Sequence, residues 1–398
     1  FTEEPWNHLP GHIYNCRIYF VFLGMAFFMP SRIGFSIWFT VLAYAAYRVI
    51  GLAYFPPYHG GTVGDHRSGA MVALTISILW LGRSHWARVF GSLFRRAADE
   101  ADRRNRTAAA MFLTGCAGMW GFMVWAGVHP LWSLFYVGFG FMVSILIARI
   151  VAETGMPFIR IDCGYVVSFV KLAPLAWLQP ASLYFSTVIA ILFPVASRVG
   201  VSVMGTHAIG LDPSRSPRRQ RRMAMGLVAL LLVGLIICGA AHLYNSYHHS
   251  ASIDGNTQPI SNFGIRLIQK ADQSLLDLKD GHSFEAAYNQ PGHIAFGASL
   301  AALLQLACMV WPRWPLHPIG LLMVNTFYAS NAWASVFIGW LLKGLVLRYG
   351  GARLYRRARA LFIGLIMGEV LAAVFWGVEP AIRVLLDLPY RAVPVQPY

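Results

Sequence analysis

The chain has 398 residues, of which 57% are hydrophobic and only 12% are charged, and its formal net charge is +15. A soluble domain usually has about 25% charged residues, so this composition excludes an ordinary soluble protein and indicates an integral membrane protein. The positive charge does not indicate nucleic-acid binding, because the basic residues gather in short loops between apolar runs.

Several apolar runs approach the roughly 20 residues that a helix needs to span a bilayer. In chain order we predict membrane spans at 13–29, 34–54, 70–90, 108–127, 130–151, 223–244, 291–310 and 360–378. With two irregular apolar regions added, they predict an all-α integral membrane protein, a polytopic helical bundle of about 9–11 membrane segments. We expect residues 1–398 to form a single transmembrane domain. The start at Phe1 suggests the C-terminal part of a longer chain.

The basic loops predict how the chain is oriented in its membrane. Clustered arginines in 92–106, 213–222 and 348–359 place these loops on the cytoplasmic side by the positive-inside rule. The longest polar stretch, 245–290, is then an extracytoplasmic loop region. The expected location is the bacterial inner membrane, with the chain crossing it many times.

Two regions are too irregular or too short for simple spans. Region 157–210 is apolar, but Pro174, Pro180 and Pro194 interrupt it, and proline removes a helical hydrogen bond. Region 315–343 covers about 28 residues, whereas two full crossings need roughly 40 residues. We therefore expect a re-entrant segment there, or a neighbouring span that does not cross, followed by a basic hairpin. Broken backbone at membrane depth is tolerated only against protein or a watery cavity, so both regions are candidate binding segments.

Polar side chains inside apolar segments are candidates for a substrate or ion path, since hydrocarbon normally excludes them. Glu369 is the most isolated carboxylate. It could carry a proton through a transport cycle, or it could pair with a cation from another segment, such as Lys343. His317 lies between two prolines and is expected to be extended. Asn325 and Asn331 lie deeper in the same region, where they could bind a polar solute or join neighbouring helices.

Further candidates flank the first irregular region. Arg149 and Glu153 are four residues apart, so they share a helix face. They form either a helix-end ion pair or a proton-sensitive carboxylate at a cavity mouth. Arg160 and Asp162 follow in a stretch bounded by glycine and proline, where structural pairing and contact with a solute are both open.

Lys171 and His207 are isolated polar residues of that same region. A buried Lys171 would lose its proton or find a carboxylate, but the side chain could also extend to the headgroups. His207 could titrate near neutral pH or simply cap a turn. The cysteines and the remaining histidines lack metal-ligand spacing, so we expect neither a metal nor a cofactor.

Several short sequences resemble one family. They are Trp-Pro-Leu-His-Pro-Ile-Gly at 314–320, Gly-Trp-Leu-Leu-Lys at 339–343, Arg-Tyr-Gly-Gly at 348–351, Gly-Glu at 368–369 and Ala-Arg-Ile-Val-Ala-Glu-Thr-Gly at 148–155. Phe-Ser-Ile-Trp at 35–38 and Gly-Thr-His at 205–207 fit the same pattern. The chain resembles an uncharacterised family of bacterial polytopic membrane proteins related to the oligopeptide transporter superfamily. That resemblance implies secondary transport of peptides or metal chelates, driven by protons. It supplies no substrate motif that matches residue by residue.

The sequence therefore favours a secondary transporter in which broken helices at 155–210 and 315–345 form a midplane site. Its partners would be the lipid bilayer, a small solute, protons and, in addition, further copies of the chain or subunits of a membrane complex. The motifs of common hydrolases and phosphate-binding enzymes are absent from the sequence, so we do not expect an enzyme. Two alternatives stay open, namely an accessory subunit of a larger membrane assembly and a membrane-embedded lipid-modifying transferase.

Overall fold

The computed structural model describes residues 3–55, 62–95, 99–156, 159, 161, 180–192, 203, 205, 216–248, 269, 276, 290–386 and 388–389. Every secondary-structure element in these ranges is a helix. The protein is therefore an all-α polytopic membrane protein. Its contacts divide the chain into two compact units, which are described separately. The first comprises Phe1–Gly82, Arg149–Ile161 and Ala287–Tyr398, and the second comprises Arg83–Ala148 and Asp162–Ala286.

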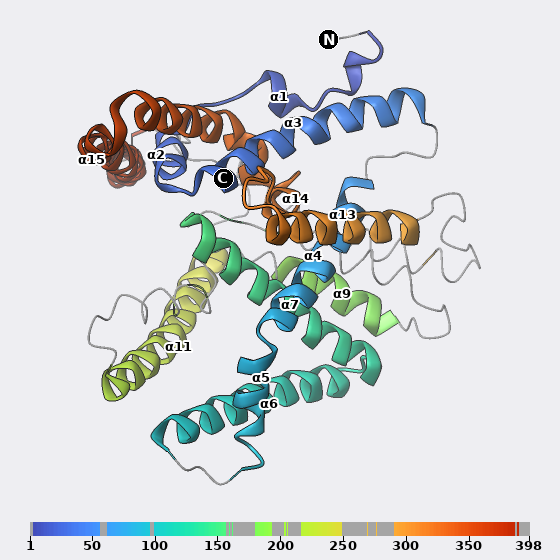
Figure 1. Cartoon of the computed structure of the whole chain (residues 1–398). Coiled ribbons are helices and arrows are strands. Elements are labelled where there is room, and N and C mark those ends of the chain that lie inside the picture. Colours follow the sequence, from blue (N-terminus) through green and yellow to red (C-terminus); the bar gives the residue numbers. More distant parts are fainter. Residues whose placement is uncertain are drawn as a thin grey trace. The chain divides into compact units, whose positions relative to one another are not determined.

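The first unit contains the candidate functional site described below, and its α-helices are labelled in Figure 1. Its elements are η1 (Trp6–His8), α1 (Gly11–Tyr14), α2 (Phe20–Phe28), α3 (Ser31–Tyr54), α4 (Thr62–Leu81), α13 (Gln290–Val310), α14 (Ile319–Met323) and α15 (Phe327–Leu385). The last turns of α7 (Pro130–Thr154), from Arg149 onward, also belong to it. Helix α3 packs against α14 and α15, α4 packs against α13, and α2 packs against α15.

The second unit contains α5 (Arg83–Gly91), α6 (Glu100–Trp125), α7 through Ala148, α9 (Pro180–Leu192) and α11 (Pro217–His248). Helix α6 begins after the extended residue Asp99, and Glu100 and Asp102 in its first turn suit the positive end of a helix dipole. Tyr136 of α7 donates a hydrogen bond to the carbonyl of Ser182 on α9 at 2.9 Å. This bond joins two helices across a buried position.

Six helices in the described ranges are long and apolar enough to cross a membrane. They are Ser31–Tyr54, Glu100–Trp125, Pro130–Thr154, Arg221–Ala241, Pro291–Val310 and Tyr328–Pro380. The spans predicted at 34–54, 108–127, 130–151, 223–244 and 291–310 are confirmed as helices, with their ends shifted by a few residues. The predicted 360–378 span lies in the second part of α15.

Two predicted spans are wrong. The 13–29 run is split, because residues 15–19 are not helical and α2 has only nine residues. The extended backbone at Tyr19 is held by the Ser335 hydroxyl, which accepts the Tyr19 N–H at 2.8 Å. The 70–90 run is also split, at Gly82, and α4 begins earlier, at Thr62. The hydropathy pattern did not predict that α4 begins at Thr62, because the first turns of this helix contain charged residues. Packing buries these residues in the structure.

Region 315–343 does not contain two full spans, as its length predicted. The five-residue α14 is followed by a break at 324–326, where Asn325 has a φ of 53°. Helix α15 then begins at Phe327 and continues past Lys343. The segment 348–359, predicted as a basic hairpin, contains a sharp break at Gly351, with φ 59°, and is helical on both sides of it.

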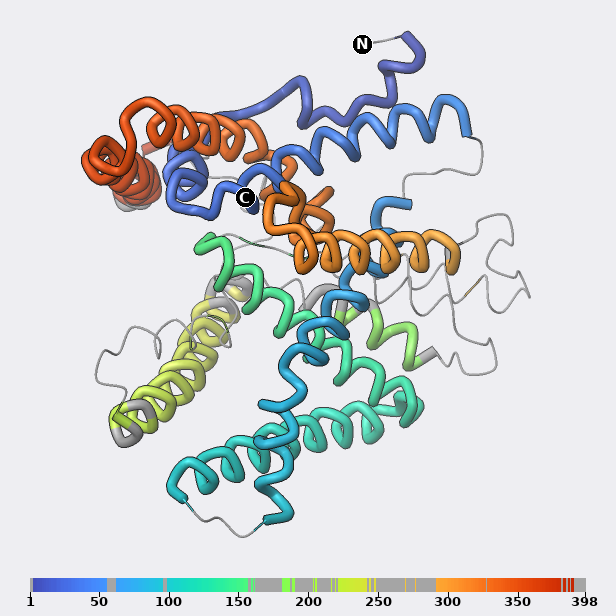
Figure 2. Tube along the Cα trace, viewed as in Figure 1, coloured from blue at the N-terminus to red at the C-terminus, as the bar shows by residue number. Residues whose placement is uncertain are grey.

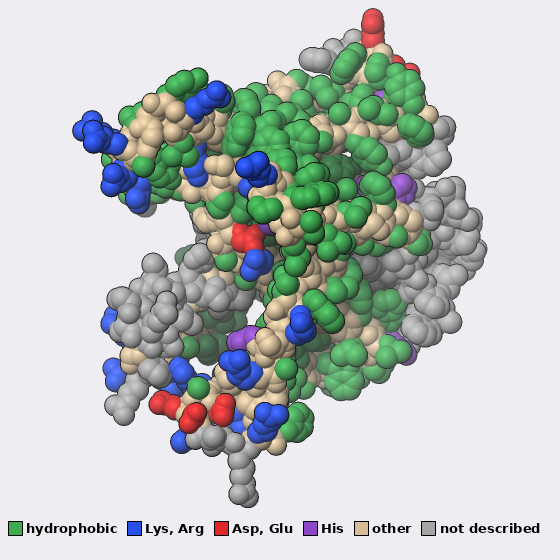
Figure 3. All heavy atoms as spheres, viewed as in Figure 1, with side chains coloured by type: hydrophobic (Ala, Val, Ile, Leu, Met, Phe, Trp, Pro, Cys, Tyr) green, Lys and Arg blue, Asp and Glu red, His purple; other side chains and the backbone are tan. Residues whose placement is uncertain are grey.

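Helix α15 therefore bends at Gly351, and Figure 2 shows its two parts together with the short α2 beside them. A positive φ suits glycine, which lacks the Cβ that would be strained there. Basic side chains gather near this bend, at the upper left of the space-filling view in Figure 3. The exposed arginines of this segment are Arg348, Arg353, Arg356, Arg357 and Arg359.

Close helix contacts in the first unit depend on small residues. A Cβ added to Gly69 of α4 would overlap the carbonyl oxygen of Ile294, and one on Gly297 of α13 would overlap the carbonyl oxygen of His66. These two helices therefore meet backbone to backbone, as small residues allow in membranes. On the other side of the unit, Phe27 of α2 stacks on Phe362 of α15, with ring centroids 3.7 Å apart.

Candidate functional site

A row of polar residues runs along α3, which is otherwise an apolar membrane helix. Its members recur at every fourth position and are Arg32, Ser36, Thr40, Tyr44 and Arg48. At 1.5 Å per residue the row is about 24 Å long, close to the thickness of a bilayer core. Because each residue advances by about 100° around the helix axis, members four residues apart are displaced by about 40° around that axis. The row thus winds around α3 and faces different partners at its two ends.

The middle of this row holds the broken segment 311–326 against α3. Ser36 Oγ accepts the backbone N–H of His317 at 2.6 Å and lies 3.2 Å from the carbonyl oxygen of Pro315. Gly320 comes so close that an added Cβ would be 2.7 Å from the carbonyl oxygen of Ser36. Backbone groups that no helix satisfies are therefore bonded to a hydroxyl of the row, as an apolar surrounding requires.

At the Arg32 end of the row lie Glu153 and His317, which the sequence offered as two separate candidate residues. Glu153, at the end of α7, forms an ion pair with Arg149 through Oε1. Its other oxygen, Oε2, lies 3.6 Å from Nε2 of His317. Arg32 belongs to the same electrostatic cluster, because its positive charge, in addition to burial, lowers the pKa of His317. The structure thus brings Arg149, Glu153 and His317 together, with Arg32 as a fourth member that sequence reasoning missed.

His317 lies in the loop between α13 and α14, outside the helices that could span a membrane. Burial, together with the positive charges of Arg32 and Arg149, lowers the pKa of His317 to about 4. The imidazole is therefore neutral near pH 7, and its contact with Glu153 is a polar contact rather than a full ion pair.

The other end of the row reaches α4 and the N-terminal segment. Tyr44 Oη lies 3.4 Å from Nδ1 of His66, and His66 Nε2 lies 3.1 Å from Nδ1 of His293. These contacts form a short chain of hydrogen-bonding groups from α3 through α4 to α13. The tautomers of the two imidazoles decide the direction of each bond.

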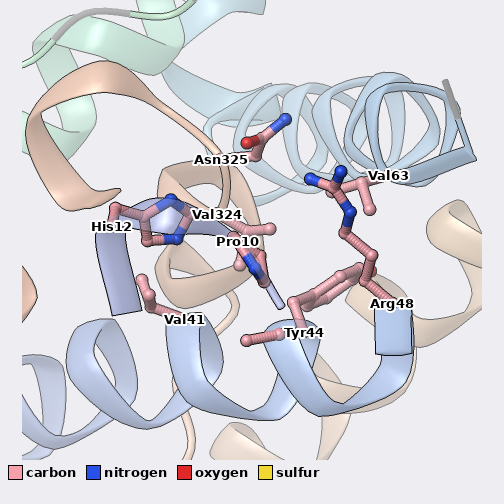
Figure 4. Close-up of a pocket in the computed structure, with 9 residues that line it drawn as sticks. Pro10, His12, Val41, Tyr44, Arg48, Val63, Val324 and Asn325 are labelled. Atoms are coloured by element: carbon pink, nitrogen blue, oxygen red, sulfur yellow. The ribbon is translucent and has the colours of Figure 1, made fainter. Parts of the chain in front are cut away.

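Arg48 and Asn325 meet at a small pocket of about 30 Å³, shown in Figure 4. His12 is also on its wall, and burial, followed by the charge of Arg48, lowers the pKa of His12. Arg67 donates a hydrogen bond to the carbonyl of Val324 at 2.9 Å, beside the break that exposes Asn325. The pocket is lined by Pro10, His12, Val41, Tyr44, Ala45, Arg48, Val63, Val324 and Asn325.

A larger, mostly apolar cavity of about 230 Å³ lies between α3 and α13. Its polar members are His317, Thr40, Tyr44 and Tyr47, so it adjoins the row at Thr40 and Tyr44. The other lining residues are Phe39, Ala43, Phe296, Leu300, Leu304, Leu316 and Leu321.

Glu369 and Lys343 occupy opposite ends of α2. Glu369 Oε2 accepts the N–H of Val21 at 3.0 Å, and the N–H of Phe20 also bonds this carboxylate. Lys343 Nζ donates to the carbonyl of Met29 at 2.5 Å, just after α2 ends. Both side chains are buried. A negative group at the N-terminus and a positive group at the C-terminus both complement the helix dipole.

Of the two alternatives left open for Glu369, a pair with Lys343 is not formed. Each charge instead satisfies one end of α2, whose terminal N–H and C=O groups have no partner within the helix. Glu369 Oε1 is buried and has no hydrogen-bond partner among the described residues. The carboxyl group therefore keeps one free oxygen for a proton.

The remaining predicted residues are divided between described and undescribed parts of the chain. Asn331 lies in the second turn of α15 and is partly buried. Arg160, Asp162, Lys171 and His207 lie outside the described residues. The polar row was missed, although its signal is readable, because serine, threonine, tyrosine and arginine recur every fourth residue in the 34–54 run.

No curated protein and no solved structure matches this chain significantly. One family profile matches residues 1–391, which is nearly the whole chain. The protein therefore belongs to the family of unknown function DUF6785.

Proposed function

We propose that this protein is a secondary transporter of the oligopeptide-transporter type, which moves a small peptide-like or chelate solute with protons across the bacterial inner membrane. The observation that carries the proposal is the polar row of α3, which faces the broken segment 311–326. Polar groups inside a membrane bundle are costly and mark substrate or ion paths. Discontinuous helices at such positions are a recurring feature of secondary transporters.

The row supports transport because it offers hydrogen-bonding groups along the length of one helix. At the middle, Ser36 bonds the backbone of the broken segment and Thr40 donates to the carbonyl of Ser36, while Arg32 and Arg48 mark the two ends. A structural anchor would need polar groups only near the membrane surfaces. A lipid-modifying enzyme would need a reactive centre at one depth rather than a row.

Glu369 is the residue that we propose for proton coupling. Its carboxylate holds the N-terminus of α2, and a proton on it would remove the charge that complements this helix end. Because α2 is short and packs against both parts of α15, a change in its capping could alter how the two parts of α15 are held. The carboxyl group of Glu369 would then both bind the proton and take part in the conformational step.

The orientation follows from the positive-inside rule. We propose that 92–106, 213–222 and 348–359 are cytoplasmic and that 245–290, nearly all of it outside the described residues, is extracytoplasmic. Single cysteines in a cysteine-free background, labelled from outside intact cells, test this map. Reaction at 245–290 and protection at the three basic segments are expected, and labelling of any basic segment from outside would overturn the orientation.

Uptake by proteoliposomes tests the transport proposal. The purified chain is reconstituted, a pH gradient is imposed, and the entry of a labelled dipeptide and of a ferric chelate is measured. Thr40→Val keeps the shape of the row but removes a hydroxyl, and Thr114→Val on the exposed face of α6 is the matched control. We expect gradient-driven uptake by the wild type and the control, with a loss in Thr40→Val. Absent uptake with a tightly co-purifying partner would favour the accessory-subunit alternative.

A further inference from the structure

Arg32 has an unusual hydrogen-bonding state for a buried guanidinium. Its Nε and Nη2 atoms are buried and have no hydrogen-bond partner among the described residues. These two nitrogens lie on the same edge of the planar group, and this edge is the one that binds a carboxylate through two parallel hydrogen bonds. Buried donors without a partner are rare in proteins, so this edge of Arg32 calls for a functional or structural explanation.

The charges around Arg32 leave it in excess. Arg149 and Glu153 form an ion pair with each other, and the neighbouring His317 is neutral near pH 7. The described groups of this cluster therefore sum to one positive charge. One guanidinium edge with one uncompensated charge matches a monoanion such as a carboxylate, whereas a phosphate dianion would call for further cations.

A second unsatisfied donor belongs to the same region. The indole Nε1 of Trp314 is buried and has no hydrogen-bond partner among the described residues. Trp314 precedes Pro315, whose carbonyl oxygen is 3.2 Å from Ser36 Oγ, one helical turn from Arg32. Both α3 and the broken segment, which meet at Ser36, thus carry a buried donor without a partner among the described residues.

The apolar cavity between α3 and α13 supplies the rest of a ligand site. His317 is both a member of the Arg32 cluster and part of the cavity wall. A solute whose carboxylate binds Arg32 could therefore place an apolar side chain among Leu300, Leu304 and Leu321. Mostly apolar walls with a few convergent polar groups are typical of small-molecule sites.

We propose that Arg32 binds the carboxylate of a small amphipathic monocarboxylate through its Nε and Nη2 edge, while the adjacent α3–α13 cavity takes the apolar part. This inference rests on the proposed function and deepens it, because it names the chemical class of the solute. It assigns to Arg32 the role of a specificity-determining residue.

Binding to the purified full chain in detergent tests this site without a membrane gradient. The probes are N-acetyl-leucine, its neutral amide N-acetyl-leucinamide, and N-acetyl-glycine, which lacks the apolar side chain; titration calorimetry and tryptophan fluorescence give the Kd. We expect N-acetyl-leucine to bind at least about tenfold more tightly than the amide, which cannot form a charged pair. N-acetyl-glycine should bind more weakly than N-acetyl-leucine, because it leaves the cavity empty.

Two variants locate the carboxylate. Arg32→Lys keeps the positive charge but cannot form the bidentate pair of hydrogen bonds with a carboxylate. It should weaken N-acetyl-leucine binding by at least about tenfold. Arg353→Lys on the exposed segment of α15 is the control and should bind as the wild type does. Equal binding of acid and amide, unchanged binding by Arg32→Lys, or no binding of any probe would overturn the site. The wild-type comparison of acid with amide decides the question even if Arg32→Lys fails to fold.

The outcomes separate this site from the transport proposal. Carboxylate binding that depends on Arg32, without uptake in proteoliposomes, would leave the site standing and reject transport. Proton-driven uptake that Arg32→Lys leaves unchanged would reject the site and keep transport.

Discussion

Replacing Glu369 by glutamine separates its structural role from proton coupling. The carboxylate accepts the N–H of Val21 at 3.0 Å, and the N–H of Phe20 also bonds it, so it satisfies two groups at the N-terminus of α2. Glutamine keeps an acceptor oxygen of the same size but can carry neither the charge nor the titrating proton. The variant therefore removes proton binding while it leaves a cap on the helix.

The expected loss of stability follows from these contacts. A hydrogen bond to a charged group contributes about 1.5–3 kcal/mol, and a neutral one contributes about 0.5–1.5 kcal/mol. Glu369→Gln should therefore lower the free energy of unfolding by about 1–2 kcal/mol. Glu369→Leu leaves the Val21 N–H buried without an acceptor, which should cost about 1–3 kcal/mol for that N–H group alone.

The assay combines thermal unfolding in detergent with uptake by proteoliposomes. We expect Glu369→Gln to fold and to exchange labelled solute across the membrane in both directions, but to lose uptake driven by a pH gradient. Glu379→Gln, on the same helix and paired with Arg383, is the matched control and should keep gradient-driven uptake. Normal proton-driven uptake by Glu369→Gln would remove this residue from the coupling mechanism.

Three further predictions concern other contacts of the first unit. Lys343→Met removes the donor to the Met29 carbonyl and should lower the unfolding free energy by about 1–3 kcal/mol, measured by thermal or urea unfolding; an unchanged midpoint would mean that Lys343 does not cap α2. Gly297→Ala places a methyl group against the backbone of α4 and should cost about 1–3 kcal/mol or more, whereas Gly118→Ala, where the space is open, should not destabilise. The pKa of His317, lowered to about 4, lies below its ordinary value of 6.5. Between these values the unfolded chain binds a proton that the folded chain does not, so stability should fall on acidification by roughly 1.4 kcal/mol per pH unit. His317→Gln should flatten this dependence, and an unchanged acid slope in that variant would refute the assignment.

Local sequence predicted several helices because span length and hydropathy are properties of one continuous run. The 34–54, 108–127 and 291–310 runs became α3, α6 and α13 for this reason. The 13–29 run failed because its break depends on Ser335, which is more than 300 residues away in the chain. A window of neighbouring residues holds no information about such a partner.

Some members of the candidate site were named from the sequence, but Arg32 and the rest of the polar row were not, and neither were the contacts between the members. Arg149 and Glu153 were recognised as a pair, since a spacing of four residues places them on one helix face. Their meeting with His317 depends on a fold that brings α7 to the loop before α14. Glu369 and Lys343 were correctly singled out as buried charges in apolar runs, but their partners are the two ends of α2.

The sequence by itself determined the class of this protein, because a bilayer selects helices by length and polarity, and both can be counted along the chain. It also determined that region 315–343 is too short for two crossings. Only the tertiary structure decided what the buried polar groups bind. In an apolar surrounding each such group needs a partner, and helix packing brings that partner from a distant part of the chain. The same holds for the Nε and Nη2 atoms of Arg32. That they have no hydrogen-bond partner among the described residues can be recognised only once the positions of the neighbouring residues are known.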